Sequence, residues 1–198
     1  GGDSTPNQVN FFALSFDPNT IQNGASDGIA LVRNSDSHVV QFLSYEGTLT
    51  ATNGPANGMT SIDIGVSESP TTSAGESLQL GGTGCLYDDF TWQGASTATA
   101  GMINNNQVFD CDGSTPMPTP QPTPAPTPAL DPVTDQFIFI NEFHYDDAGT
   151  DENESIEIAY ANVDPADYSI YLYNGGGGSG GNQYGSPHSL SGGDSTPN

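Results

Sequence analysis

The chain of 198 residues carries 24 carboxylates against one Arg and no Lys, for a formal net charge of −23. Binding to a nucleic-acid backbone needs several cations, so the solitary Arg33 excludes that class of function. No apolar run reaches the roughly 18 residues of a membrane-spanning helix, which excludes membrane insertion. Hydrophobic residues make up only 33%, but 17 Phe and Tyr gather in strand-like runs, which argues against disorder throughout.

Short apolar runs bounded by turn residues fill the N-terminal part of the chain. They are rich in Val, Ile, Phe and Tyr and predict β-strands at 8–16, 28–33, 38–45, 61–66, 77–80 and 90–93. The polar stretch Asn34-Ser35-Asp36-Ser37 separates two of these runs and predicts a hairpin.

Two cysteines, Cys85 and Cys111, lie 26 residues apart in this part of the chain. In an extracellular protein an even pair usually forms a disulfide, and closing this loop would stabilise the fold by about 3 kcal/mol. Two reduced, buried thiols are the alternative. Asp110 and Asp112 flank Cys111 and disfavour a thiolate, which argues against a reactive role.

A proline-rich segment follows at 114–132, with eight prolines in 19 residues and a repeated T-P-x-P unit. Such a segment favours the polyproline II conformation, in which its 19 residues would span about 59 Å. We therefore interpret 110–135 as an extended linker. Candidate O-glycosylation sites lie at Thr115, Thr119, Thr123 and Thr127, with an unmodified spacer as the alternative.

Three further apolar runs, at 137–145, 155–160 and 168–173, predict strands beyond this linker. The glycine run at 175–181 follows the last of them without a helix after it, so we interpret it as a loop and not a phosphate site. No stretch sustains a helical period for three turns. The fold class is therefore all-β, as a two-sheet sandwich.

Six carboxylates fall within the twelve residues 146–157. Closely spaced oxygen ligands in a loop between strands suit Ca²⁺, which takes six to eight oxygens, although the spacing is not that of an EF-hand. A solvated acidic loop is the alternative. The candidate calcium ligands are Asp146, Asp147, Asp151, Glu152 and Glu154.

The two ends of the chain are the same heptapeptide, because 1–7 and 192–198 both read GGDSTPN. We interpret this as a head-to-tail repeat of 191 residues, with a duplicated expression scar as the alternative. The chain would then be one period cut from a longer array. Residues 1–109 would be the C-terminal two-thirds of one repeat, and 136–198 the N-terminal third of the next.

Read in that repeat order, the chain resembles the bacterial lamin-tail domain. The resemblance rests on FIFINEFHYDD, SIEIA, YSIYLYN, DGIALV and FLSYEG, and covers everything except the linker. It implies an immunoglobulin-like sandwich in a secreted bacterial protein, often beside extracellular hydrolases. Here the end of the domain precedes its beginning, so we expect a neighbouring repeat to complete the sandwich.

Two function classes remain open, because no catalytic constellation is present in the sequence. The favoured hypothesis is a structural unit of an extracellular filament or cell-surface fibre, whose only required partner is itself. Its units would join head to tail by β-strand complementation. The apolar residues expected to complete the neighbouring sandwich are Phe137, Ile138, Phe139, Ile140, Phe143, Ile156, Ile158, Ile170 and Leu172.

The alternative is a non-catalytic module of a secreted hydrolase or adhesin that binds calcium or a surface glycan. In that case Tyr171, Tyr173, Tyr184 and Trp92 would form a sugar-stacking face. Aromatic residues in sandwich strands are more often part of the core, so burial of these four would weigh against the alternative.

Overall fold

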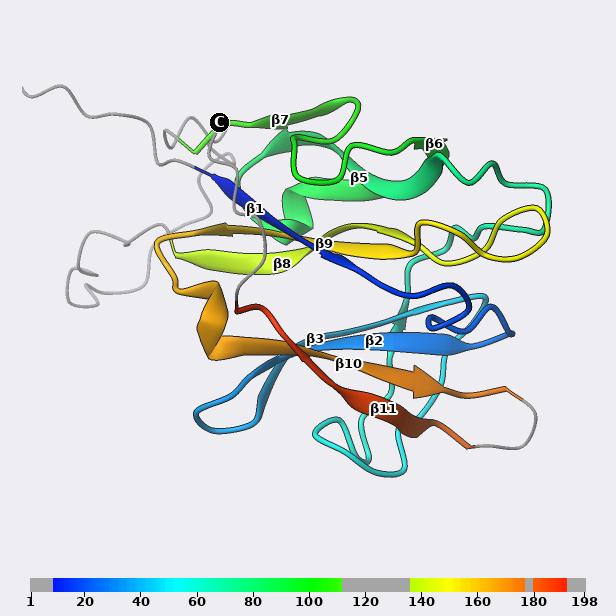
Figure 1. Cartoon of the computed structure of the whole chain (residues 1–198). Coiled ribbons are helices and arrows are strands. Elements are labelled where there is room, and N and C mark those ends of the chain that lie inside the picture. Colours follow the sequence, from blue (N-terminus) through cyan, green and yellow to red (C-terminus); the bar gives the residue numbers. More distant parts are fainter. Residues whose placement is uncertain (1–8, 112–135, 177–179, 192–198) are drawn as a thin grey trace, which may run out of the picture.

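The computed structural model describes residues 9–111, 136–176 and 180–191 and consists almost entirely of β-strands in two packed sheets (Figure 1). We call 9–111 the first segment and the described residues of 136–191 the second segment. The candidate glycosylation sites Thr115, Thr119, Thr123 and Thr127, and both copies of the heptapeptide, lie outside the described residues.

The first segment contains seven strands and one short 3₁₀-helix. These are β1 (Asn10–Ser15), β2 (Asp27–Arg33), β3 (His38–Tyr45), β4 (Ile62–Asp63), β5 (Glu76–Gly84), η1 (Tyr87–Asp89), β6 (Phe90–Thr97) and β7 (Gln107–Phe109). The second segment contains β8 (Phe137–His144), β9 (Ser155–Ala161), η2 (Pro165–Asp167), β10 (Tyr168–Asn174) and β11 (Asn182–Ser189).

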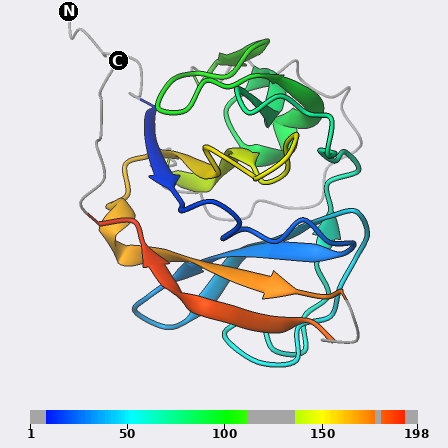
Figure 2. The same cartoon turned by 45° about the vertical axis from the view of Figure 1, so that its right-hand side comes forward.

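Strands of the two segments alternate within both sheets. One sheet has the order β1-β9-β8-β5-β6, with β7 paired to β5, and the other has the order β11-β10-β2-β3-β4. In Figure 2 the yellow and orange strands of the second segment accordingly lie among the blue and green strands of the first. Neither segment alone contains a complete sheet, so the sandwich exists only when both are present.

The core forms because apolar side chains recur at every second position and point to the face between the sheets. Ile156 and Ile158 of β9 are fully buried in this core, together with Leu78 of β5 and Leu31 of β2. Strand β8 is buried at all eight positions. Its outer face is covered as well, since Phe109 of β7 stacks on Phe137 with ring centroids 6.1 Å apart.

The predicted all-β, immunoglobulin-like sandwich is confirmed, and each predicted strand overlaps an observed one. The run at 61–66 is the weakest case, because only Ile62–Asp63 pairs there. The predicted hairpin joins β2 to β3, with Ser37 in the left-handed region at φ 56°. Directly after β10 the chain packs tightly at Gly175, where a side chain would collide with the carbonyl oxygen of Ser26.

Two strands were not predicted from the sequence, β7 and β11. The first has only three residues, and the second reads NQYGSPHS without an apolar run. Among the described residues no helix has the length and apolar character needed to span a membrane.

Candidate functional site

The boundary between the two segments runs through both sheets. The nine apolar residues predicted to complete a sandwich all lie on it and are all buried: Phe137, Ile138, Phe139, Ile140, Phe143, Ile156, Ile158, Ile170 and Leu172. Ile158 lies opposite Phe12 of β1, and Leu172 lies opposite Ile29 of β2. The second segment therefore pairs with the first in both sheets. The sandwich in this structure is completed by the chain's own second segment, and completion by a neighbouring repeat stays a prediction.

A buried polar network crosses the same boundary on the outer face of the first sheet. Glu142 of β8 accepts hydrogen bonds from Ser77 Oγ at 2.6 Å and from Thr99 Oγ1 at 2.6 Å. Glu157 of β9 accepts from Asn141 Nδ2 at 2.9 Å and from the backbone N–H of Gly101 at 2.6 Å. The donors come from both segments, so the network joins them through specific hydrogen bonds as well as apolar contact.

Burial and the nearby carboxylate of Glu142 shape the ionisation of Glu157. The two glutamates are 0% and 1% exposed and face each other across the β8–β9 pairing. Desolvation is the main cause that raises the pKa of Glu157 to about 8, although the hydrogen bond from Asn141 opposes the shift. Glu157 is therefore largely protonated at neutral pH, which avoids the cost of burying its charge at the boundary.

A second buried ionic group joins Glu68 in the loop before β5 to the end of β8. Its carboxylate accepts from the backbone N–H of Tyr145 at 2.6 Å and of Asp146 at 3.0 Å, and contacts His144 Nδ1 at 2.8 Å. Burial alone would lower the pKa of His144, but Glu68 and then Asp147 outweigh it, and the pKa is raised. His144 is thus a structural ion-pair partner that ties the two segments together.

The acidic loop predicted to bind calcium is structured mainly by hydrogen bonds to its own backbone and to the first segment. Asp147 accepts from the N–H of Glu152 at 3.0 Å, and Asp151 accepts from the N–H of Asp147 at 3.2 Å and from Asn23 at 3.1 Å. Asp146 accepts from Asn23 at 3.5 Å.

Of the other two members of the acidic set, Glu152 is exposed, whereas Glu154 is buried and binds the first segment directly. One oxygen accepts from the N–H groups of Thr20 and Ile21 at 2.9 and 2.8 Å, while Oε1 is buried without a partner in the described residues. Burial raises the pKa of both Glu154 and Asp146. Across the described ranges, no three His, Cys, Asp or Glu side chains are grouped to hold a metal ion, so calcium binding remains an untested prediction.

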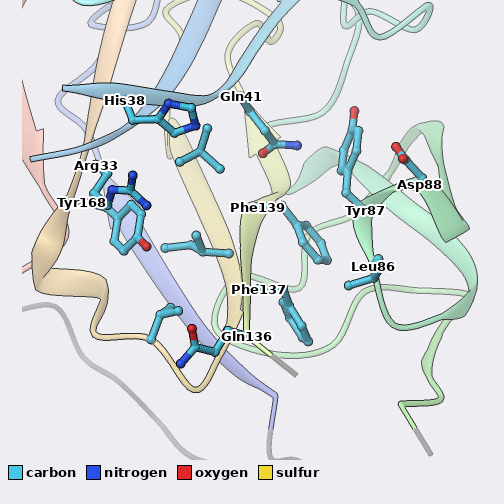
Figure 3. A pocket seen from close by; sticks show the side chains of 13 residues that line it. Arg33, His38, Gln41, Leu86, Tyr87, Asp88, Gln136, Phe137, Phe139 and Tyr168 are labelled. Atoms are coloured by element: carbon cyan, nitrogen blue, oxygen red, sulfur yellow. The ribbon is translucent and has the colours of Figure 1, made fainter. Parts of the chain in front are cut away.

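The disulfide lies where the proline-rich segment leaves the sandwich. Cys85 and Cys111 are bonded, with Cα atoms 4.8 Å apart, and so connect the end of β5 to the residue that precedes 112–135. Beside this disulfide is a pocket of about 490 Å³, which residues of both segments line (Figure 3). This pocket was not predicted from the sequence, because its walls come from five separate elements, β2, β3, η1, β8 and β10, and from the residues between them.

The aromatic residues proposed for sugar stacking do not form an exposed face. Tyr173 is 0% exposed, and its hydroxyl accepts from the N–H of Ala56 at 3.0 Å. Trp92 is 8% exposed, and its ring meets Phe143 edge-on. Tyr184 and Tyr171 are only partly buried, but each packs against a buried cluster. The ordinary interpretation of aromatic residues in sandwich strands, as core, therefore fits at least Tyr173 and Trp92.

Comparison of the chain with protein-family models, with curated proteins and with solved structures finds no match. The resemblance to the lamin-tail domain therefore rests on the sequence motifs alone, and the site must be interpreted from its own chemistry.

Proposed function

We propose that the chain is a structural unit of an extracellular filament or surface fibre, in which units join head to tail by β-strand complementation. The single observation that carries the proposal is the interleaved sheet order. Strands β8 and β9 lie between β1 and β5, and β10 lies between β11 and β2. A first segment that receives β8–β11 from a neighbour would make the same backbone pairs. Exchange of these strands between units would therefore lose few strand contacts.

The length of the proline-rich segment favours exchange between units over closure within one. Rings of Phe109 and Phe137, on either side of it, stack with centroids 6.1 Å apart. A polyproline II conformation over 114–132 would separate its ends by about 59 Å, and the five residues left between Cys111 and Gln136 recover only about 20 Å. Closure within one chain requires the segment to bend, whereas a bridge to a neighbour does not.

The repeated heptapeptide and the positions of β1 and β11 support a serial arrangement. In Figures 1 and 2, β1 begins and β11 ends on the same side of the sandwich. A short peptide such as GGDSTPN would therefore suffice to run from the second segment of one unit into the first segment of the next. The disulfide supports an oxidising, extracellular location, and the charge of −23 would keep fibres apart.

The test measures assembly of the full chain by light scattering and electron microscopy. A variant with 114–132 replaced by 19 Gly and Ser residues closes freely within one chain, so we expect monomers where the wild type forms oligomers or filaments. The matched control scrambles 114–132 but keeps all eight prolines, and should assemble like the wild type.

The size of the reduced, denatured native chain then separates two forms of the same proposal. A species many times 20.5 kDa indicates a covalent array of repeats, and a species near 20.5 kDa indicates separate units joined by strand exchange. A native chain of 20.5 kDa that stays monomeric at high concentration would contradict both forms.

A further inference from the structure

The pocket of Figure 3 lies at the end of the sandwich where the proline-rich segment is attached at both of its ends. Gln136, the first residue described after that segment, lines the pocket. So does Leu86, whose neighbour Cys85 is bonded to Cys111, the last residue described before the segment. The volume of about 490 Å³ lies within the range of about 300–1,000 Å³ typical of ligand sites.

One wall of the pocket is aromatic. Tyr87 and Phe139 meet with ring centroids 5.9 Å apart, and Phe137 stacks on Phe139 at 5.4 Å. The hydroxyl of Tyr87 accepts a hydrogen bond from Trp92 Nε1 at 3.1 Å, which fixes the orientation of the Tyr87 ring. Leu86 is 56% exposed at the rim. This wall suits flat, apolar rings, and Arg33, His38 and Asp88 also line the pocket.

The wall also contains a hydrogen-bond donor that lacks an acceptor. Gln41 of β3 accepts from the backbone N–H of Ile140 through Oε1 at 2.7 Å, which sets the orientation of its amide. Its Nε2 is buried and has no partner among the described residues. In Figure 3 the Gln41 amide lies on the same side of the pocket as Tyr87 and Phe139. A ligand that brings a carbonyl oxygen to this wall would satisfy the unpaired donor.

The chain itself contains a ligand with this chemistry. Between Ser114 and Leu130 the sequence carries no charged residue, and its T-P-x-P units favour polyproline II. Such a helix leaves every backbone carbonyl free, has few donors, and presents proline rings of the kind that aromatic grooves bind in other proteins. Because the segment is tethered at the rim, its local concentration is in the millimolar range, and a weak site suffices.

We propose that this pocket is the docking site for one T-P-x-P turn of the chain's own proline-rich segment. Proline rings lie against Tyr87 and Phe139, and a segment carbonyl accepts from Gln41 Nε2. Docking fixes the direction in which the segment leaves the sandwich, so successive units of a filament would keep a defined angle. The inference does not depend on filament assembly, since the pocket and the segment belong to every copy of the chain.

The test uses the full chain with 114–132 replaced by Gly and Ser, so that the pocket is vacated, and a synthetic peptide of residues 114–132 as the probe. Fluorescence of Trp92, the only tryptophan, reports on the pocket through its bond to Tyr87. We expect a saturable change with the peptide and none with a peptide whose prolines are replaced by alanine.

Three variants in the same background locate the binding. Leu86→Asp places a charge at the rim and should weaken the peptide about tenfold or more. Gln41→Glu keeps the acceptor for Ile140 but removes the donor, and should also weaken binding. The control is Ile62→Asp, which changes an equally apolar residue, 65% exposed, on strand β4 of the other sheet, and should bind like its parent.

Several outcomes would overturn the docking proposal: no fluorescence response in the folded protein, equal affinity for the alanine peptide, or unchanged affinity in the Leu86→Asp variant. A response to soluble glycans in place of the peptide would assign the pocket to sugars and would also overturn it. A change of Trp92 fluorescence with protein concentration alone, without peptide, would assign the pocket to a second copy of the chain and would also overturn the proposal. Failure of filament assembly is read separately by light scattering and leaves the peptide titration unaffected.

Discussion

At the scale of single residues, the two segments are joined by groups whose charge depends on pH. Glu157 has a pKa of about 8 in the folded chain against 4.5 in the unfolded chain. Between these values the folded state binds a proton that the unfolded state does not, so stability falls as pH rises. His144 acts in the same direction, because its raised pKa gives stability that is present below pH 6.5 and is lost as pH rises through the folded pKa.

The first prediction follows from this loss of stability with rising pH. The wild type should lose on the order of 1 kcal/mol of unfolding free energy per pH unit between pH 5 and 8. Glu157→Gln keeps the shape of the protonated acid, so the part of this slope due to Glu157 should disappear, and the variant should be the more stable protein at pH 8. Urea unfolding at three pH values measures the effect. Asp17→Asn, at an exposed turn carboxylate, is the control and should follow the wild type; a parallel slope for Glu157→Gln would refute the assignment.

At the scale of elements, the sequence was informative wherever a strand had its own apolar pattern. FIFINEFH and SIEIAYA marked β8 and β9, and the Asn34-Ser37 stretch marked a hairpin. Strand β11 was not predicted because it contains Gly185 and Pro187, which are tolerated at the edge position that it occupies. Strand β7 was not predicted because its three residues are too few to show a periodic pattern of apolar residues.

The second prediction concerns the disulfide that joins the end of β5 to the residues after β7. Only three residue pairs connect these two strands, so the covalent bond is an important constraint on β7. Replacing both Cys85 and Cys111 by Ser should cost about 3 kcal/mol and lower the Tm by about 6–12 °C. Calorimetry of the variant and of the wild type with reductant should agree, since both lose the same bond. An unchanged Tm in both would show that β7 needs no such constraint.

At the scale of the whole molecule, the site was less predictable than the fold, since it depends on pairings across long sequence separations. The alternation in SIEIAY would place Glu157 toward solvent, but the polypeptide around Gly101 covers it. Glu68 binds the backbone of Tyr145, which is 77 residues away. No local pattern encodes such contacts. Chain-wide composition, in contrast, was read directly from the sequence, and the excess of 24 carboxylates over one Arg has consequences for stability.

The last prediction is that added salt stabilises the protein mainly by screening. A net charge of −23 opposes the compact state through self-repulsion. Raising NaCl from about 0.01 M to about 0.5 M shortens the Debye length from about 30 Å to about 4 Å, and should raise the Tm by about 5 °C. CaCl₂ at equal ionic strength separates screening from a specific site. The acidic loop's carboxylates already accept hydrogen bonds from Asn23, Thr20 and Ile21, so we expect calcium to add little beyond screening. A further Tm rise with calcium that Asp151→Asn abolishes would instead establish a metal site in this loop. Glu154 Oε1, which has no hydrogen-bond partner in the described part of the chain, would be the next ligand to test.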